Sequence, residues 1–220
     1  MKRAAGLFAG SLLAATCAFF IACRTARPAG EEAPIAPLTA ATPEDALRQL
    51  HAIRFPERSL MRVRATSGDR TQSFRAQLLL NGGMLLTAYT QLGTTAMRLY
   101  ADSNHVVFLN DVEKTWWSGT PEEFARSFGF FGDASPVDMA LLILGRPVGA
   151  ARATANGLER AELGGATITY DPPSFPPKRV TIVRGDQRLD IEHLESAYTT
   201  ANVEAPEVPG NYRCCFPPRL

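Results

Sequence analysis

The sequence has little cysteine, no second long apolar run and no excess of charge of one sign, and each shortage excludes a class of protein. Only 4 of the 220 residues are cysteine, too few for a fold held together by several disulfides. The 23 Lys and Arg residues nearly balance the 22 Asp and Glu residues, so nothing favours a nucleic-acid partner. The longest apolar run beyond the N-terminus, 139–144, is too short to cross a bilayer.

Catalytic and metal-binding motifs are also missing. The chain has no G-x-S-x-G, H-E-x-x-H or C-x-x-C sequence and no glycine-rich phosphate loop. His51, His105 and His193 lie in unrelated segments, and Asp111 and Glu113 share a turn instead of forming an acid/base pair. We therefore expect no catalytic residue, no metal site and no cofactor.

The first 22 residues have the layout of an export signal. A basic pair precedes an apolar stretch that ends in Ala22 and Cys23. This resembles the lipobox of bacterial lipoprotein signal peptides, although Phe20 stands where leucine is usual. The resemblance implies cleavage before Cys23 and acylation of its thiol, and two or more acyl chains suffice for stable anchoring. An ordinary cleaved signal peptide or an uncleaved anchor is the alternative.

Composition divides the remaining chain into three parts. Segment 23–41 is rich in Ala, Pro, Thr and Glu, which predicts a flexible tether. Segment 42–200 has the length and apolar content of one domain. Segment 201–220 is rich in proline and predicts a flexible tail. Its Cys214 and Cys215 are compatible with a strained vicinal disulfide, a bond between chains or two free thiols.

Three helices are predicted from their first residues. In each case a hydroxyl residue precedes proline, and a carboxylate follows three positions after the hydroxyl. This arrangement caps the helix N-terminus, and acidic residues in the first turn complement the helix dipole. Gly145 stands where a helix-terminating glycine is expected. The predicted helices are 43–54, 121–129 and 136–144.

Most other segments alternate between apolar and polar residues, which is typical of strands. Short turns with Gly, Asn or Asp join them, so neighbouring strands must be antiparallel. The predicted strands are 60–65, 74–80, 84–90, 95–100, 106–109, 166–170, 179–184 and 189–193. The fold class is therefore mainly β with short helices (α+β): an unclosed antiparallel β-barrel or curved sheet of about eight strands.

The helix 136–144 is apolar on nearly all sides. Such a helix is buried on most of its surface, and the concavity of a curved sheet would bury it. It is either a plug or lid over an apolar cavity or an ordinary helix beneath a neighbouring loop.

The order and spacing of several short segments resemble the LolB family of outer-membrane lipoprotein receptors. The resemblance covers about 55–193, although 158–178 looks shorter than in the family, with prolines in place of a hairpin. The matching segments are the strands 60–65 and 74–80, the stretch 85–95, the strand 96–100 with its turn into 106–110, the segment 116–129 as the first inner helix, the Leu-Ile-Leu-Gly-Arg-Pro stretch 142–147, and the closing hairpin 177–182 with 185–189.

This resemblance implies an unclosed barrel with a helical lid around an apolar cavity for lipoprotein acyl chains. It implies a LolA-like periplasmic carrier as a partner and attachment by the lipid anchor to the periplasmic face of the outer membrane. Arg24 after Cys23 is consistent with that sorting. Leu92, followed by Gly93, matches the exposed leucine that the family inserts into the membrane, and a core position beside a turn is the alternative for Leu92.

An acyl-chain carrier needs apolar area in place of catalytic groups, and flexible methionines suit such a lining. The alternatives are a structural or regulatory outer-membrane lipoprotein that binds protein partners, with the concavity filled by its helix, and a carrier of another envelope lipid. The residues expected to line the cavity are Met61, Val63, Phe74, Ala76, Leu78, Leu86, Met97, Leu99, Phe108, Trp116, Phe124, Met139 and Leu142.

Overall fold

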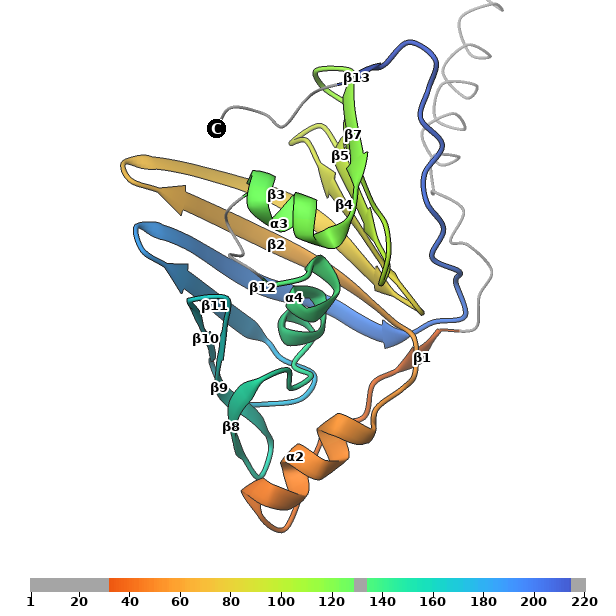
Figure 1. Ribbon diagram of the computed structural model, residues 1–220. Helices are drawn as coiled ribbons and strands as arrows, with labels where there is room; N and C mark the ends of the chain where they lie inside the picture. The colour runs from red at the N-terminus through yellow and green to blue at the C-terminus, as the bar shows by residue number, and fades with distance from the viewer. Residues whose placement is uncertain (1–31, 129–133, 215–220) are drawn as a thin grey trace, which may run out of the picture.

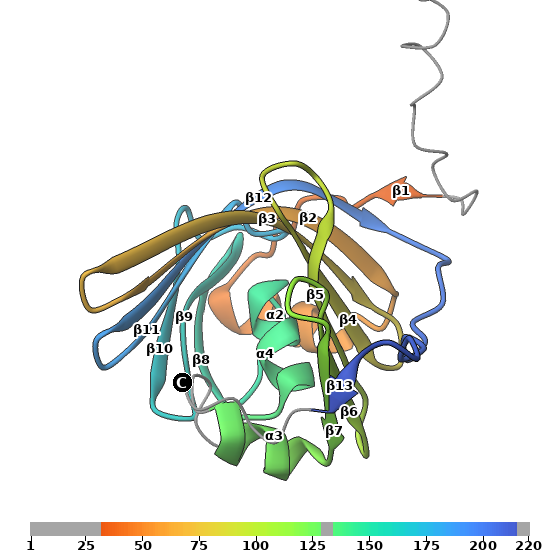
Figure 2. The ribbon, with the colours of Figure 1, turned by 90° about the horizontal axis from the view of Figure 1, so that it is seen from above.

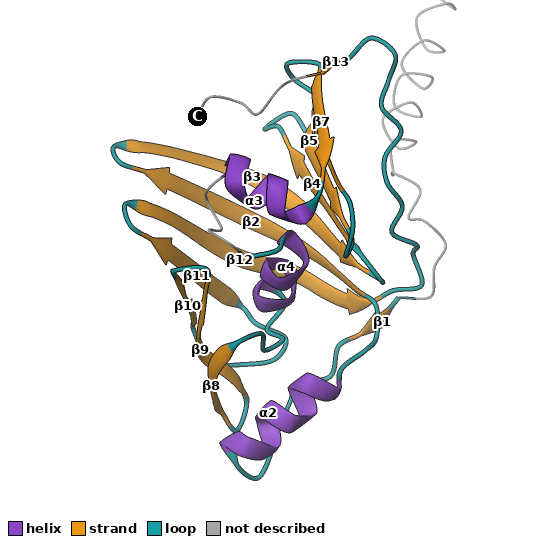
Figure 3. Cartoon of the chain, viewed as in Figure 1, coloured by secondary structure: helices purple, strands orange, loops and turns teal. Residues whose placement is uncertain are grey.

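Two consecutive antiparallel meanders join side by side and, with the short strands β1 (Ala33–Pro34) and β13 (Arg213–Cys214), form one 13-stranded sheet (Figures 1 and 3). The computed structural model describes residues 32–128 and 134–214. The first meander consists of β2 (Glu57–Ser67), β3 (Arg70–Leu80), β4 (Met84–Tyr89), β5 (Thr95–Ala101), β6 (Val106–Asn110) and β7 (Thr115–Gly119). The second consists of β8 (Ala150–Thr154), β9 (Gly157–Leu163), β10 (Ala166–Tyr170), β11 (Arg179–Arg184) and β12 (Gln187–Tyr198).

The meanders meet where β2 pairs with β12, and the sheet stays open between β8 and the other edge. Two short helices, α3 (Pro121–Phe128) and α4 (Pro136–Ile143), connect β7 to β8. The sheet curves around α4, and α3 lies near the open side (Figure 2). This mainly β, unclosed, curved sheet with short helices confirms the predicted fold class.

Side-chain alternation explains which face of each strand points inward. On β2, Met61 and Val63 are buried, whereas Arg62 and Arg64 are exposed. The hairpin between β3 and β4 turns at Gly82, whose φ of +71° favours glycine. The turn is closed by a hydrogen bond from the Asn81 amide to the Gly83 carbonyl. Strands β3 and β4 therefore form an antiparallel hairpin at the turn that was predicted.

The three predicted helices are present, each with the expected N-terminal cap. The hydroxyls of Thr42, Thr120 and Ser135 accept from the amides three residues later. The first helix, α2 (Pro43–Ala52), contacts β8 and β9 at the end of the sheet. None of the helices in the described ranges is long and apolar enough to span a membrane.

Three strands of the meanders were not predicted. The segment expected to begin an inner helix at Trp116 forms β7 instead, and α3 starts at Pro121. Here Thr115, Trp116 and Trp117 have high β propensity and pair with β6. The strands β8 and β9 were not predicted because their alanines give no clear alternation of apolar and polar residues. The proline-containing segment 171–178 is a connection without strand, as its prolines suggested.

Both segments predicted to be flexible contribute to the fold. Strand β1 (Ala33–Pro34) pairs with β12, and Ile35 is buried in the core. Beyond β12 the chain continues to β13 (Arg213–Cys214), which pairs in parallel with β7. The described parts of the predicted tether 23–41 and of the predicted tail 201–220 thus each pair with the sheet over two residues. The predicted cleavage and lipidation sites, Cys23 included, lie outside the described residues, as does Cys215.

Candidate functional site

Helix α4 lies in the concavity of the sheet with its apolar residues on nearly all sides. Pro136 begins the helix after the Ser135 cap. The Gly145 amide bonds to the Leu142 carbonyl and the Arg146 amide to the Leu141 carbonyl, which is a Schellman ending. Gly145 has φ of +79°, as such an ending requires. The local sequence thus predetermines a helix of about two turns.

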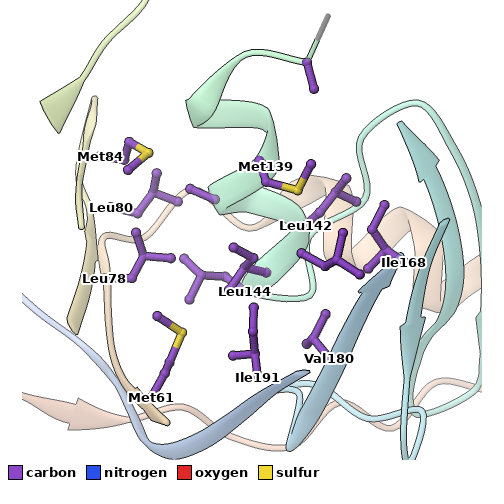
Figure 4. Packing of buried hydrophobic residues seen from close by; sticks show 14 of the residues in the cluster. Met61, Leu78, Leu80, Met84, Met139, Leu142, Leu144, Ile168, Val180 and Ile191 are labelled. Carbon is purple, nitrogen blue, oxygen red and sulfur yellow. The ribbon is translucent and has the colours of Figure 1, made fainter. Parts of the chain in front are cut away.

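Apolar side chains from both meanders surround this helix (Figure 4). Met139 and Leu142 on α4 are fully buried, as is Leu144 just after it. They face Met61, Leu78, Leu80 and Met84 from the first meander and Ile168, Val180 and Ile191 from the second. Because α4 occupies the space between the two meanders, the sheet and the helix share one hydrophobic core.

The residues expected to line a cavity fall into three groups. The half-buried side chains of Phe74, Leu86 and Phe108 pack against the edge of the core. Met97 and Trp116 are half-buried but lie outside this core. The remaining positions are buried within it: Met61, Val63, Ala76, Leu78, Leu99, Phe124, Met139 and Leu142.

The tryptophan on the concave side is Trp117, not Trp116. In the register of β6 and β7, Trp117 lies opposite Phe108, and Trp116 lies opposite Leu109 on the other face. Trp117 also packs against Phe124 of α3, with ring centroids 5.7 Å apart. Neighbouring residues of a strand point to opposite faces of the sheet. Because this segment was expected to be a helix, the sequence did not show which of the two tryptophans faces inward.

A buried ion pair fastens the C-terminal end of α4 to strand β2. The Arg146 guanidinium donates to Glu57 through Nε at 3.1 Å and Nη2 at 2.6 Å, and Nη2 also donates to the Phe55 carbonyl. Desolvation raises the pKa of the Glu57 carboxyl, and the charge and hydrogen bonds of Arg146 oppose this shift. Sequence reasoning missed both residues, although the alternation on β2 places Glu57 on the same face as Met61.

A buried hydrogen bond attaches the last turn of α4 to strand β10. The Tyr170 hydroxyl on β10 donates to the Leu142 carbonyl at 2.8 Å. Burial raises the pKa of Tyr170, so the hydroxyl stays a donor at neutral pH. Helix α4 is therefore attached through polar contacts to both meanders, to β2 through Arg146 and to β10 through Leu142.

His193 lies beneath the end of α4, at the bulge of β12. Its Nδ1 is 2.7 Å from the Ser59 hydroxyl, and its Nε2 is buried. Desolvation lowers the pKa of His193 to about 4, although the backbone of Ile143 favours the charged ring. Ser59 is fully buried. In this structure the Ser59–His193 pair is therefore not accessible to a substrate, whereas the nucleophile of a hydrolase must be.

Acidification is expected to destabilise the fold through His193. The pKa of His193 in the folded chain is about 4, below the ordinary histidine value of 6.5. Between these two pH values the unfolded chain binds a proton at His193 that the folded chain excludes. Stability is lost as the pH falls between these values, by up to about 3 kcal/mol. Urea unfolding at about pH 7 and about pH 4.5 should show this loss reduced in His193→Gln. Exposed His51→Gln is the control, and an equal loss in both variants would contradict the assignment.

The loop between β4 and β5 presents Leu92 to solvent, and the side chain is 93% exposed. The Thr90 amide bonds to the Thr94 carbonyl at 2.8 Å, and the Gly93 amide bonds to the Thr90 carbonyl at 3.0 Å. Gly93 has φ of +81°, which suits glycine. Leu92 is therefore the tip of a closed loop and not a core residue beside a turn.

Two hollows lie outside the space that α4 fills. One, of about 450 Å³, is bounded by β8 and β9 and includes Arg152 and Arg160. The other, of about 600 Å³, lies beside the Leu92 loop and includes Arg75 and Tyr89. Neither is lined by α4. Among the described residues, no group of three His, Cys, Asp or Glu side chains could hold a metal ion.

Comparisons with known proteins find distant structural likeness only. No model of a known protein family matches the chain, and no curated protein matches it. Among solved structures, 39 chains match. The LolA superfamily protein from Nitrosomonas europaea is 10% identical, with a TM-score of 0.46 over 74% of this chain and 96% of that chain.

Two further solved structures are similarly distant. A domain described as a putative outer membrane lipoprotein-sorting protein, from Vibrio parahaemolyticus, is 8% identical, with a TM-score of 0.46 over 72% of this chain and 91% of that one. An uncharacterized conserved protein from Thermus thermophilus is 6% identical, with a TM-score of 0.42 over 77% and 96% of the two chains. These likenesses are too low to assign the chain to a family.

Proposed function

We propose that this chain is a LolB-like envelope lipoprotein that binds acyl chains in the concavity of its sheet and takes part in the transfer of lipoproteins, or of other lipids, to the outer membrane. The observation that carries the proposal is the apolar concave face, covered by one short apolar helix. A buried acyl chain gains about 0.8 kcal/mol for each CH₂. A long chain can therefore compete with the side chains of α4 for this face.

The composition of the interior suits such an exchange. Met61 on β2, Met84 on β4 and Met139 on α4 are all buried in the core that surrounds the helix. Methionine side chains are unbranched and adapt to irregular neighbours. In this proposal α4 is a plug that an entering acyl chain displaces, and the residues that it covers become the lining.

The half-buried residues mark the proposed entrance. Phe74, Leu86, Met97 and Phe108 belong to neighbouring strands of the first meander, and their register places them on the concave face. All four retain some exposure while α4 fills the centre. An acyl chain that enters here replaces water at apolar surface before any part of the core has to open.

The remaining parts of the proposal concern attachment and partners. Acylated Cys23 would hold the protein on the periplasmic face of the outer membrane, and a LolA-like carrier would deliver the cargo. Leu92 would enter the membrane that receives it, and its exposure at a closed loop supports that role. No catalytic step or cofactor is required, because transfer depends on relative apolar burial.

One observation favours a second function. Met139 and Leu142 fill the concavity, and the two hollows lie elsewhere. If α4 stays in place, the fold is a scaffold, and the protein is a structural or regulatory lipoprotein that binds protein partners. The two functions differ in whether the interior admits an apolar ligand.

Uptake of a fluorescent fatty acid by the mature chain without its lipid, residues 24–220, tests the proposal. Leu86→Glu, on the concave face, is expected to weaken uptake by about ten-fold or more, since a buried leucine contributes about 1.5–3 kcal/mol. The matched control is Leu85→Glu, which changes the neighbouring residue on the opposite face of β4 and should preserve uptake. Circular dichroism establishes that both variants are folded. No saturable uptake by the unchanged chain would favour the scaffold function.

A further inference from the structure

The outer face of the sheet carries a polar hollow at the base of the Leu92 loop. Its walls come from β2, β3 and β4 and from the loop itself, and its volume is about 600 Å³. The residues that matter for its chemistry are Leu60, Arg62, Ser73, Arg75, Tyr89 and Gln91. The hollow therefore adjoins the loop whose tip projects into solvent.

Two arginines lie opposite each other at this hollow. Arg62 on β2 is the direct cross-strand partner of Arg75 on β3. Arg62 has a carboxylate partner, because Glu192 accepts from its Nη1 at 2.6 Å. Within the described residues Arg75 has no ion pair with any carboxylate. Like charges directly opposite on a sheet destabilise it, and an anion placed between the two guanidinium groups would remove that cost.

The other walls suit a phosphate group attached to an apolar body. Ser73 and Gln91 supply polar side chains, and Leu60 supplies apolar surface. The Tyr89 hydroxyl donates to Gln77 at 3.1 Å, which fixes the orientation of the ring. The hollow thus combines the Arg75 guanidinium, hydrogen-bonding groups and an apolar wall, whereas a site for a small hydrated ion needs no apolar wall.

A second apolar tip stands beside Leu92. The loop between β6 and β7 carries Val112, which is 65% exposed. The Asp111 amide of this loop bonds to the Ala96 carbonyl at the start of β5, so both loops lie at the same end of neighbouring strands. Asn110 accepts from the Val112 amide, which fixes the second tip. Two adjacent apolar tips beside a cationic hollow indicate a membrane surface.

We propose that this end of the sheet docks on a bilayer, with Leu92 and Val112 in the apolar boundary and an anionic phospholipid headgroup in the hollow, its phosphate held by Arg75. The proposal rests on the proposed function in one respect, because it assumes that the Leu92 tip meets the membrane. It adds a headgroup site and a second inserting residue. An acidic protein partner fits less well, since it would leave both apolar tips in water.

Vesicle flotation with the mature chain, residues 24–220, tests this proposal. Two vesicle types are used, phosphatidylcholine alone and phosphatidylcholine mixed with phosphatidylglycerol in equal amounts. The unchanged chain should bind the anionic vesicles more tightly. Arg75→Gln should reduce that affinity about five-fold, because one cationic side chain near an anionic membrane contributes about 1 kcal/mol to binding. Its binding to the neutral vesicles should be unchanged. The matched control is Arg48→Gln, which removes an equal charge from an exposed position on α2, at the far end of the molecule (Figure 1).

Val112→Gln should weaken binding to both vesicle types by about ten-fold, because the apolar tip no longer enters either membrane. Equal binding of the unchanged chain to both vesicles, with no effect of Arg75→Gln, would overturn the headgroup site and leave the acyl-carrier function standing. An equal loss in Arg75→Gln and Arg48→Gln would also overturn it, since net charge alone would then explain the preference. No binding to either vesicle would overturn both the docking surface and the membrane role of Leu92, whereas fatty-acid uptake would still test the interior.

Discussion

Exchange of Arg146 for methionine is expected to lower the free energy of unfolding by about 3–5 kcal/mol, because it leaves Glu57 buried without its partner. Glu57 is 1% exposed, so solvent cannot replace the two hydrogen bonds that Arg146 donates to its carboxylate. The Phe55 carbonyl loses a donor as well. Methionine keeps the length and apolar part of the arginine side chain, and the loss therefore measures the polar contacts.

Urea unfolding with two further variants separates the ion pair from packing. Glu57→Gln combined with Arg146→Met should recover much of the loss, because no buried charge is left unpaired. Arg179→Met, which removes an exposed arginine 3.9 Å from Asp171, should cost less than about 1 kcal/mol. If Arg146→Met alone is as stable as the unchanged chain, the ion pair has no structural role.

The same variant has a predicted pH dependence. Burial already raises the pKa of Glu57, so the folded chain binds its proton more readily than the unfolded chain does. Without Arg146 this pKa rises further, and the ionised carboxylate destabilises the fold at neutral pH. The deficit of Arg146→Met should therefore shrink as the pH falls and be smallest below the pKa of an unfolded glutamate, because Glu57 is then neutral in the folded and the unfolded chain.

Local patterns predicted most of the strands because apolar and polar residues alternate along them, as on β2, where one face is buried. Met61 and Val63 alternate with arginines, so both the strand and its inner face follow from the sequence. The same rule failed at β8 and β9, where alanine and arginine provide no apolar periodicity. It also failed at Ile35, which lies in a segment with the composition of a linker and is buried only because β1 pairs with β12.

The contacts that fasten the helix could not be predicted from local patterns. Glu57 and Arg146 are 89 residues apart in the chain, and only the joining of the two meanders brings them together. The N-terminal cap at Ser135 and the glycine ending at Gly145 predict the helix itself but not what it covers. Apolarity on all sides of α4 indicated burial, and the topology supplies the concavity in which it is buried.

Truncation of Leu142 to alanine is expected to destabilise the protein by about 2–5 kcal/mol and to make its interior more receptive to an acyl chain. Leu142 is fully buried on α4, between residues of both meanders. Its removal leaves an apolar space, and the cost depends on how far the surrounding side chains collapse into it. Apolar cavities stay dry and accept apolar ligands, so a fatty acid that reaches the concavity should fill the space.

Thermal unfolding with and without lauric acid distinguishes the two functions. If acyl chains enter the concavity, lauric acid at about a hundred times its dissociation constant should restore about 2.7 kcal/mol to Leu142→Ala. The unchanged chain should gain less, because the ligand must first displace the Leu142 side chain. Leu50→Ala on α2, also fully buried, should be destabilised to a similar extent and gain no more than the unchanged chain. If Leu142→Ala gains nothing from lauric acid, α4 is a fixed part of the core, and the concavity serves as a scaffold for protein partners.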